Sequence, residues 1–101
     1  MKNHTKIYLN AFNYDVCDFI SSEISGKKAV DIHHIISRGR GGKDEIENLM
    51  ALTRDEHIKY GDKNQYIYFL LEIHENYLIK NNISFDKNKI EMLKLKYEDR
   101  Y

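Results

Sequence analysis

One stretch, from Asp31 to His57, constrains this chain more than any other part of it. It begins with Asp31-Ile32-His33-His34-Ile35, continues through a basic loop rich in glycine, and ends with Asn48-Leu49 and His57. Three of the five histidines lie in this stretch, together with the only pair of adjacent glycines. We therefore interpret the rest of the chain as support for these residues.

The composition is that of a small globular protein. With 101 residues and no proline, the chain is expected to form one domain, spanning residues 1–101, with a small core. No apolar run approaches the roughly 18–20 residues of a membrane span, and the first residues are not followed by the unbroken apolar stretch of a signal peptide. We therefore expect a cytoplasmic protein that is encoded by a bacterium or a phage. The single cysteine, Cys17, cannot form an internal disulfide and is predicted to be a small buried hydrophobe.

The formal net charge is zero, so the chain as a whole has no electrostatic preference for nucleic acid. Positive charge is nevertheless concentrated between positions 27 and 43, where Asp31 is the single acid. These basic side chains lie where a bound polyanion would need positive charge, although a solvated basic loop is the simpler alternative. Our candidates for phosphate contacts are Arg38, Arg40 and Lys43.

The first half of the chain predicts a short helix and a hairpin. Apolar residues near helical spacing indicate a helix over residues 6–14. Residues 15–28 are interpreted as a loop that leads into the first arm of a hairpin, and residues 29–35 as its second arm. Strand alternation puts His33 and His34 on opposite faces, unless a bulge turns both imidazoles into one cleft.

The second half predicts three helices. After the short apolar segment 48–52, Thr53 and Glu56 have the spacing of a capping box, which indicates a helix that ends near Gly61. A longer helix is predicted over residues 63–81, where His74 is expected to be a hydrogen-bonded core residue. A last helix near residues 87–98 has Asp86 as its N-cap. These elements together predict an α+β fold.

Histidines in this pattern suit the hydrolysis of a phosphodiester. The reaction needs an activated water and stabilisation of negative charge on the phosphoryl and leaving oxygens. An imidazole can accept a proton near neutral pH, and a divalent cation can neutralise phosphate charge. His33 and His34 can divide these roles, and His57 would lie in the first helical turn, where the helix dipole favours a neutral, ligating imidazole.

The order and spacing of these residues resemble the HNH endonuclease motif. The resemblance covers about residues 20–61 and rests on the Asp31–Ile35 run, the Arg38-Gly39-Arg40-Gly41-Gly42 loop, Asn48-Leu49 and His57. It implies a ββα-metal core, here with an N-terminal helix and a helical extension over residues 63–101 that contains two further helices.

The resemblance also implies a role for each site residue. His34 corresponds to the general base that activates water, and His33 and His57 to ligands of one divalent metal ion. Asn48 is counted with the catalytic residues but is expected to fix the loop to the strand by hydrogen bonds. Asp31 could orient His33 or complete the metal coordination, and a solvated strand acid is an equal alternative.

The chain departs from the family at one feature. Many small HNH proteins bind a structural zinc through two C-x-x-C pairs, at positions that match Ser22 and Ser25, and Thr53 and Glu56. No structural zinc is expected here because the four thiolates are missing. We hypothesise that the capping box at Thr53 and the C-terminal helices fix His57 instead.

The resulting functional prediction is a metal-dependent endonuclease that cuts DNA, with double-stranded DNA as the favoured substrate. The cation would be Mg, Mn, Ni, Co or Zn. Two alternatives stay open: a DNA-binding module that does not cut, within a larger phage or restriction assembly, and a structural metal-bound interaction domain. The helix over residues 63–81 could close the monomer core or form a homodimer interface.

Overall fold

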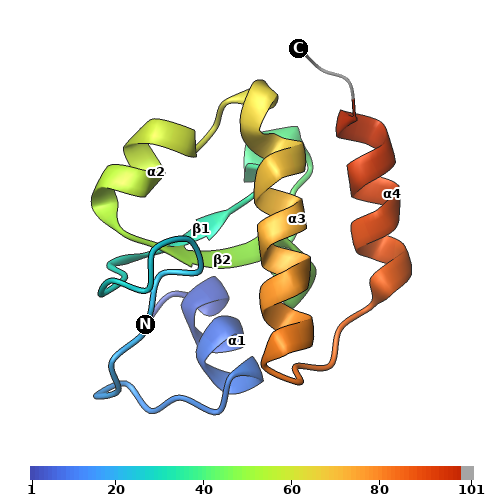
Figure 1. The fold of residues 1–101 in the computed structure, drawn as a ribbon. Helices are drawn as coiled ribbons and strands as arrows, with labels where there is room; N and C mark the ends of the chain where they lie inside the picture. The colour runs from blue at the N-terminus through green and yellow to red at the C-terminus, as the bar shows by residue number, and fades with distance from the viewer. Residues whose placement is uncertain (99–101) are drawn as a thin grey trace.

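The computed structural model describes residues 1–98 as a two-stranded sheet surrounded by helices. Figure 1 shows α3 (Asn64–Lys80) crossing the sheet. Helix α1 (Asn3–Ala11) lies at one end of α3, and α4 (Lys87–Tyr97) packs alongside α3. Strands β1 (Asp31–His34) and β2 (Leu49–Leu52) lead into the short helix α2 (Arg54–Tyr60). The predicted α+β class and its ββα core are thus confirmed, together with the N-terminal and both C-terminal helices.

The two strands pair antiparallel in an unbroken register, with His33 opposite Met50 and His34 opposite Leu49. The hairpin is therefore β1–β2, closed by the long loop between them, and no bulge interrupts it. The prediction that residues 15–28 lead into the first arm of a hairpin, with residues 29–35 as the second, was wrong, because an isolated bridge between Ser21 and Lys28 is the only strand pairing described there. Residues of this region bond to β2 instead, through the Glu23 N–H and the Ala51 carbonyl, at 3.0 Å.

Strand β2 is buried on both faces, which explains its continuous apolar sequence. Leu49 and Ala51 pack in a cluster with Tyr8 of α1. Met50 and Leu52 pack on the other side, in a cluster that includes Ile67, Leu70 and Leu71 of α3. The apolar stripe of α3 therefore closes the core of the chain itself, and a homodimer would have to use another surface.

The local helix signals placed α2, α3 and α4 closely, and the predicted range 63–81 of α3 differs from the observed one by one residue at each end. Helix α2 begins after Thr53 with the predicted capping box and ends at Gly61, and α4 begins after Asp86, whose carboxylate accepts the N–H groups of Asn88 and Lys89. Helix α1 begins three residues earlier than predicted and ends at Ala11, because Asn13 takes a left-handed conformation with φ 57°. The part of the chain that the structure describes contains no helix long and apolar enough to cross a membrane.

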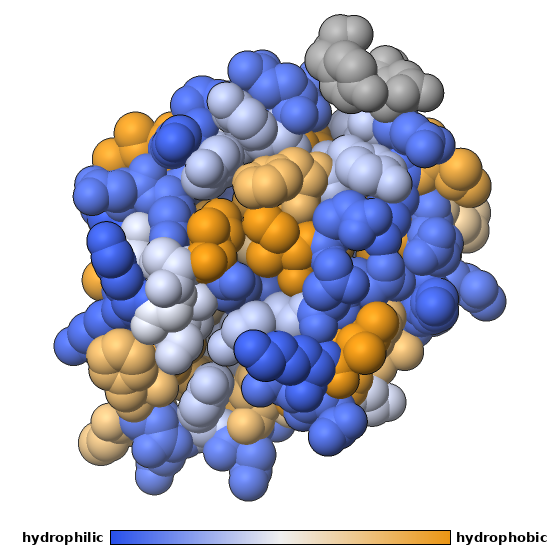
Figure 2. All heavy atoms as spheres, in the orientation of Figure 1, coloured by the Kyte–Doolittle hydropathy of each residue, from blue (hydrophilic) through white to orange (hydrophobic). Residues whose placement is uncertain are grey.

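The surface matches the high content of charged residues. Figure 2 shows a mostly hydrophilic face on which apolar side chains gather in limited patches. Cys17 lies on the surface, so its predicted burial was wrong. The turn that carries Cys17 is held by hydrogen bonds of Asp15 and Asp18 rather than by packing against the core.

The predicted core position of His74 is confirmed. Its Nδ1 lies 2.7 Å from Glu23 Oε1, and its Nε2 lies 2.6 Å from the carbonyl oxygen of Ile46. Tyr8 donates its hydroxyl to the other carboxylate oxygen of Glu23 at 2.6 Å. Both imidazole nitrogens thus face acceptors, and only the doubly protonated imidazolium can donate to both. Burial by itself would lower the pKa of His74, but the Glu23 carboxylate outweighs it and raises this pKa.

This buried pair predicts a pH-dependent stability. Because the pKa of His74 is higher in the folded than in the unfolded protein, its stabilisation is complete below about pH 6.5 and is lost as the pH rises through the folded pKa. We expect His74→Gln to lower the free energy of unfolding at pH 6 by about 3–5 kcal/mol, the cost of breaking a buried pair. The difference in melting temperature from the wild type should shrink toward pH 9, and a constant difference would contradict the assignment.

Candidate functional site

The histidines of the Asp31–His57 stretch border one open cleft of about 890 Å³. Strand β1 runs along this cleft, and the first turn of α1 and His57 of α2 form other parts of its wall. His33 faces α2 and His34 faces α1, as the alternation of an unbroken strand requires. Both imidazoles nevertheless reach the same cleft, because it extends over both sides of this edge strand.

His33 and His57 form one pair. Their ring centroids lie 4.6 Å apart, and His33 is 4% exposed. Within residues 1–98 the buried Nε2 of His33 has no hydrogen-bond partner. Burial, together with the neighbouring His57, lowers the pKa of His33 to about 4. His33 therefore presents a neutral imidazole nitrogen with an unused lone pair or N–H group beside a second imidazole.

Gly61 allows the end of α2 to approach these rings. A Cβ atom at this position would lie 2.6 Å from Cδ2 of His57 and 3.2 Å from Cε1 of His33. It would also lie 2.4 Å from the backbone oxygen of His57, which accepts the Gly61 N–H at 2.8 Å. Glycine is needed here for space, because its φ of −67° is open to any residue.

Asp31 supports His57 rather than His33. Its Oδ2 lies 3.1 Å from Nδ1 of His57, and Arg54 binds both carboxylate oxygens, at 3.0 and 3.2 Å. Partial burial would raise the pKa of Asp31, but the hydrogen bonds from His57 and Arg54 outweigh it and lower this pKa. An ionised Asp31 accepts a hydrogen bond from Nδ1–H, which leaves the lone pair of neutral His57 on Nε2. The expectation that Asp31 orients His33 therefore named the wrong imidazole.

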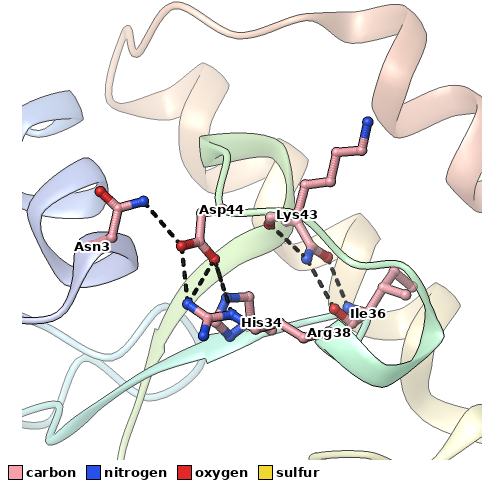
Figure 3. A network of polar contacts seen from close by, with 7 residues as sticks. Asn3, His34, Ile36, Arg38, Lys43 and Asp44 are labelled. Atoms are coloured by element: carbon pink, nitrogen blue, oxygen red, sulfur yellow. Dashed lines mark hydrogen bonds and ion pairs between the residues drawn. The ribbon is translucent and has the colours of Figure 1, made fainter.

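His34 forms the second pair, with Asp44, as Figure 3 shows. Nε2 of His34 lies 2.7 Å from Oδ1 of Asp44, and Arg38 and Asn3 also donate to this carboxylate. The hydrogen bond from His34, followed by those of Asn3 and Arg38, holds the pKa of Asp44 well below its usual range. The sequence reasoning missed Asp44, because nothing in its spacing indicates that the loop folds back onto β1.

His4 was also missed, because it lies 27 positions before Asp31 and nothing in the sequence connects it with the Asp31–His57 stretch. It lies instead in the first turn of α1, where its ring centroid is 4.5 Å from that of His34. Its Nδ1 is buried and has no hydrogen-bond partner among the described residues. Burial, together with the adjacent His34, lowers the pKa of His4. Local sequence gave no signal for this contact, which depends on how α1 docks against the sheet.

Asn48 fixes the loop that follows β1. It is 2% exposed, its Oδ1 accepts the Ile36 N–H at 2.7 Å, and its Nδ2 donates to the carbonyl oxygens of Ile36 and Lys43 at 3.0 and 3.1 Å. Gly42 passes so close that a Cβ atom would lie 1.7 Å from the Ile36 oxygen. These are the loop-to-strand hydrogen bonds expected of Asn48.

The three basic candidates of this loop differ in their surroundings. Arg38 is bound to Asp44, and Arg40 donates to the side chain of Asn64. The ammonium group of Lys43 forms no ion pair with the described residues, and Figure 3 shows it pointing away from the His34–Asp44 pair. Phosphate contacts by these residues stay a prediction.

Comparison with known proteins agrees with this geometry. Residues 17–63, which include both strands and α2, match the family model of the HNH endonucleases. These residues form an HNH endonuclease domain. A curated relative of the chain is the "Probable mobile endonuclease C" of Enterobacteria phage T4, 36% identical over 55 residues. The match covers 54% of this chain but 25% of that protein. No solved structure matches significantly.

A polar network occupies the positions at which the resemblance to the family would place zinc-binding cysteines. Ser22 donates its hydroxyl to Glu56 Oε1 at 2.5 Å and accepts the N–H groups of Ile24 and Ser25. Glu56 also accepts the Thr53 N–H at 2.9 Å and donates its own N–H to the Thr53 hydroxyl at 3.1 Å. Glu56 immediately precedes His57, so this network ties the loop at Ser22 to the helical turn that carries His57.

If this network positions His57, removing the N-cap of α2 should lower both the stability of the protein and its activity. We expect Thr53→Ala to lower the free energy of unfolding by about 1 kcal/mol, the usual cost of a lost N-cap. This corresponds to roughly 4–8 °C in melting temperature, with a parallel loss of nuclease activity. Thr53→Ser keeps the hydroxyl and is the matched control. Unchanged activity in Thr53→Ala would contradict the positioning role.

Proposed function

We propose that this chain hydrolyses phosphodiester bonds of double-stranded DNA, with a divalent metal ion held by His33 and His57 and with His34 as the general base. The observation that supports this most strongly is that one cleft is bordered both by the His33–His57 imidazole pair and by His34, which is paired with a carboxylate. His33 and His57 offer nitrogen atoms to a cation, while His34 is paired with a carboxylate. Membership of residues 17–63 in the HNH endonucleases supports the same reaction.

The residues present fit a metal ion. The unpartnered Nε2 of buried His33 provides one ligand, and Nε2 of His57, oriented by Asp31 through Nδ1, provides the second. Imidazole ligands suit Mn, Co, Ni or Zn better than Mg, which would keep several waters. When bound, such an ion neutralises charge on the phosphate and on the leaving oxygen. The low pKa of His33 supports this role, because protonation does not compete with ligation at neutral pH.

His34 has the partner that a general base needs. The ionised Asp44 accepts a hydrogen bond from Nε2–H of His34, so the lone pair of the neutral imidazole is on Nδ1. We propose that Nδ1 takes the proton of the attacking water. The Asp44 carboxylate then stabilises the imidazolium that forms, as the carboxylate does in other His–Asp pairs.

The basic loop is the proposed contact for the DNA backbone. Arg38 and Arg40 have protein partners in the free protein, so they would exchange these for phosphate oxygens on binding. The Arg38 side chain is 60% exposed, which allows this exchange. Because the net charge is zero, we expect weak binding that decreases steeply with salt and depends little on sequence.

Nicking of a supercoiled plasmid tests this proposal against its two alternatives. The assay compares Mg, Mn, Co, Ni and Zn with EDTA, and is combined with a DNA-binding measurement and a melting curve. Metal-dependent cutting supports the endonuclease. DNA binding that survives EDTA without cutting would favour a binding module. Thermal stabilisation by metal, with neither binding nor cutting, would favour a structural metal-bound interaction domain.

A further inference from the structure

We propose a second divalent-cation site, formed by His4, His34 and Asp44, at which a transition-metal ion inhibits the enzyme. One ring nitrogen from each histidine and one carboxylate oxygen lie within 4.8 Å of one another. The three residues come from α1, β1 and the loop after β1. They lie across β1 from the His33–His57 pair, so the two sets share no residue.

The chemistry of this set favours a transition metal. Two imidazoles and one carboxylate are a common set of protein ligands for Zn²⁺, and the same set binds other divalent ions of the first transition row. Mg²⁺ prefers oxygen ligands and would compete poorly here. The buried Nδ1 of His4 has no hydrogen-bond partner within residues 1–98, so the free protein leaves part of the ligating capacity of this residue unused.

The contacts of Oδ2 of Asp44 can persist when a cation replaces the hydrogen bond between Oδ1 and His34. Oδ1 is the oxygen that lies 2.7 Å from Nε2 of His34, whereas Oδ2 accepts from Asn3 and from Arg38, both at 3.0 Å. Arg38 also reaches Oδ1 at 3.1 Å, and this contact would have to be released. The exposed Arg38 side chain can turn toward solvent while Asn3 keeps the carboxylate in place.

Inhibition follows from the tautomer of His34, and this step depends on the proposed function. A cation on Nε2 of neutral His34 takes the lone pair there, and the single ring proton moves to Nδ1. Nδ1 then has no lone pair with which to accept a proton from water. The ion at His4, His34 and Asp44 thus removes the base without touching the proposed activating ion.

Zinc binding tests the site independently of cleavage. By equilibrium dialysis we expect the wild type to bind two zinc ions, and His4→Ala and His57→Ala to bind one each. His4→Gln, which keeps side-chain bulk, is the second variant in case His4→Ala does not fold. A zinc stoichiometry that neither His4 variant changes would overturn the proposed site, whether or not the protein cuts DNA.

The inhibition is tested by adding zinc to plasmid cleavage at fixed Mg²⁺. With each rate expressed relative to the same protein without zinc, we expect His4→Ala to need about tenfold more zinc than the wild type for half inhibition. Equal inhibition of both proteins would overturn the inhibitory role. Zinc binding that depends on His4 in a protein that cuts DNA with no metal would support the site and reject the proposed function, so the two failures are distinguishable.

Discussion

His34→Ala is expected to cut plasmid DNA about a hundredfold to ten-thousandfold more slowly than the wild type, the usual contribution of a positioned general base. The variant should still bind a cation at His33 and His57, because His34 projects from the other face of β1. The loss should therefore appear in the single-turnover rate and not in the concentration of Mn²⁺ that gives half of the maximal rate.

Two comparisons separate chemistry from folding in this experiment. A melting curve of His34→Ala shows whether the fold survives, and Asp44→Asn changes the partner of the base while keeping a side chain of the same size. We expect Asp44→Asn to cut more slowly than the wild type but faster than His34→Ala, because an amide oxygen can still accept a hydrogen bond from Nε2–H. Wild-type nicking by a folded His34→Ala would refute its role as base.

Asn48→Ala is expected to have the largest effect on stability among single changes at the site. It would leave the Ile36 N–H and the carbonyl oxygens of Ile36 and Lys43 without their side-chain partner inside the protein. Each unsatisfied buried group costs about 1–3 kcal/mol, so the two fully buried groups, both of Ile36, should lower the free energy of unfolding by about 2–6 kcal/mol.

Urea unfolding measures this loss. The matched control is Asn88→Ala, which removes an exposed asparagine side chain from α4 and should change stability little. Cleavage by Asn48→Ala should decrease as well, because the loop that Asn48 fixes carries Asp44, the partner of His34. An Asn48→Ala variant as stable as Asn88→Ala would show that these hydrogen bonds do not hold the loop.

The parts of the structure that could be predicted from sequence are those set by local chemistry. Thr53 and Glu56 cap α2, Asp86 caps α4, and the apolar stripe of α3 packs into the core as its spacing indicates. Each of these signals acts over a few residues along the chain. The same locality placed His57 in the short helix that follows β2, although it lies in the last turn of α2 and not in the first.

The partners of the site residues could not be predicted in the same way. Asp31 bonds to His57, 26 positions away, and His34 meets both Asp44 and His4. These pairs depend on the docking of α1 and on the path of the loop over β1, which no local pattern encodes. Cys17 shows the same limit, because its exposure follows from a turn that does not reach the core.

The dependence of single-turnover plasmid cleavage on Mn²⁺ concentration, measured for the wild type and His57→Ala, tests the central claim most directly. If His33 and His57 hold the activating ion, His57→Ala should need at least about tenfold more Mn²⁺ for half of its maximal rate. The wild type should be inactive in EDTA. Superimposable Mn²⁺ curves for the two proteins, or full cleavage in EDTA, would contradict the proposed metal site.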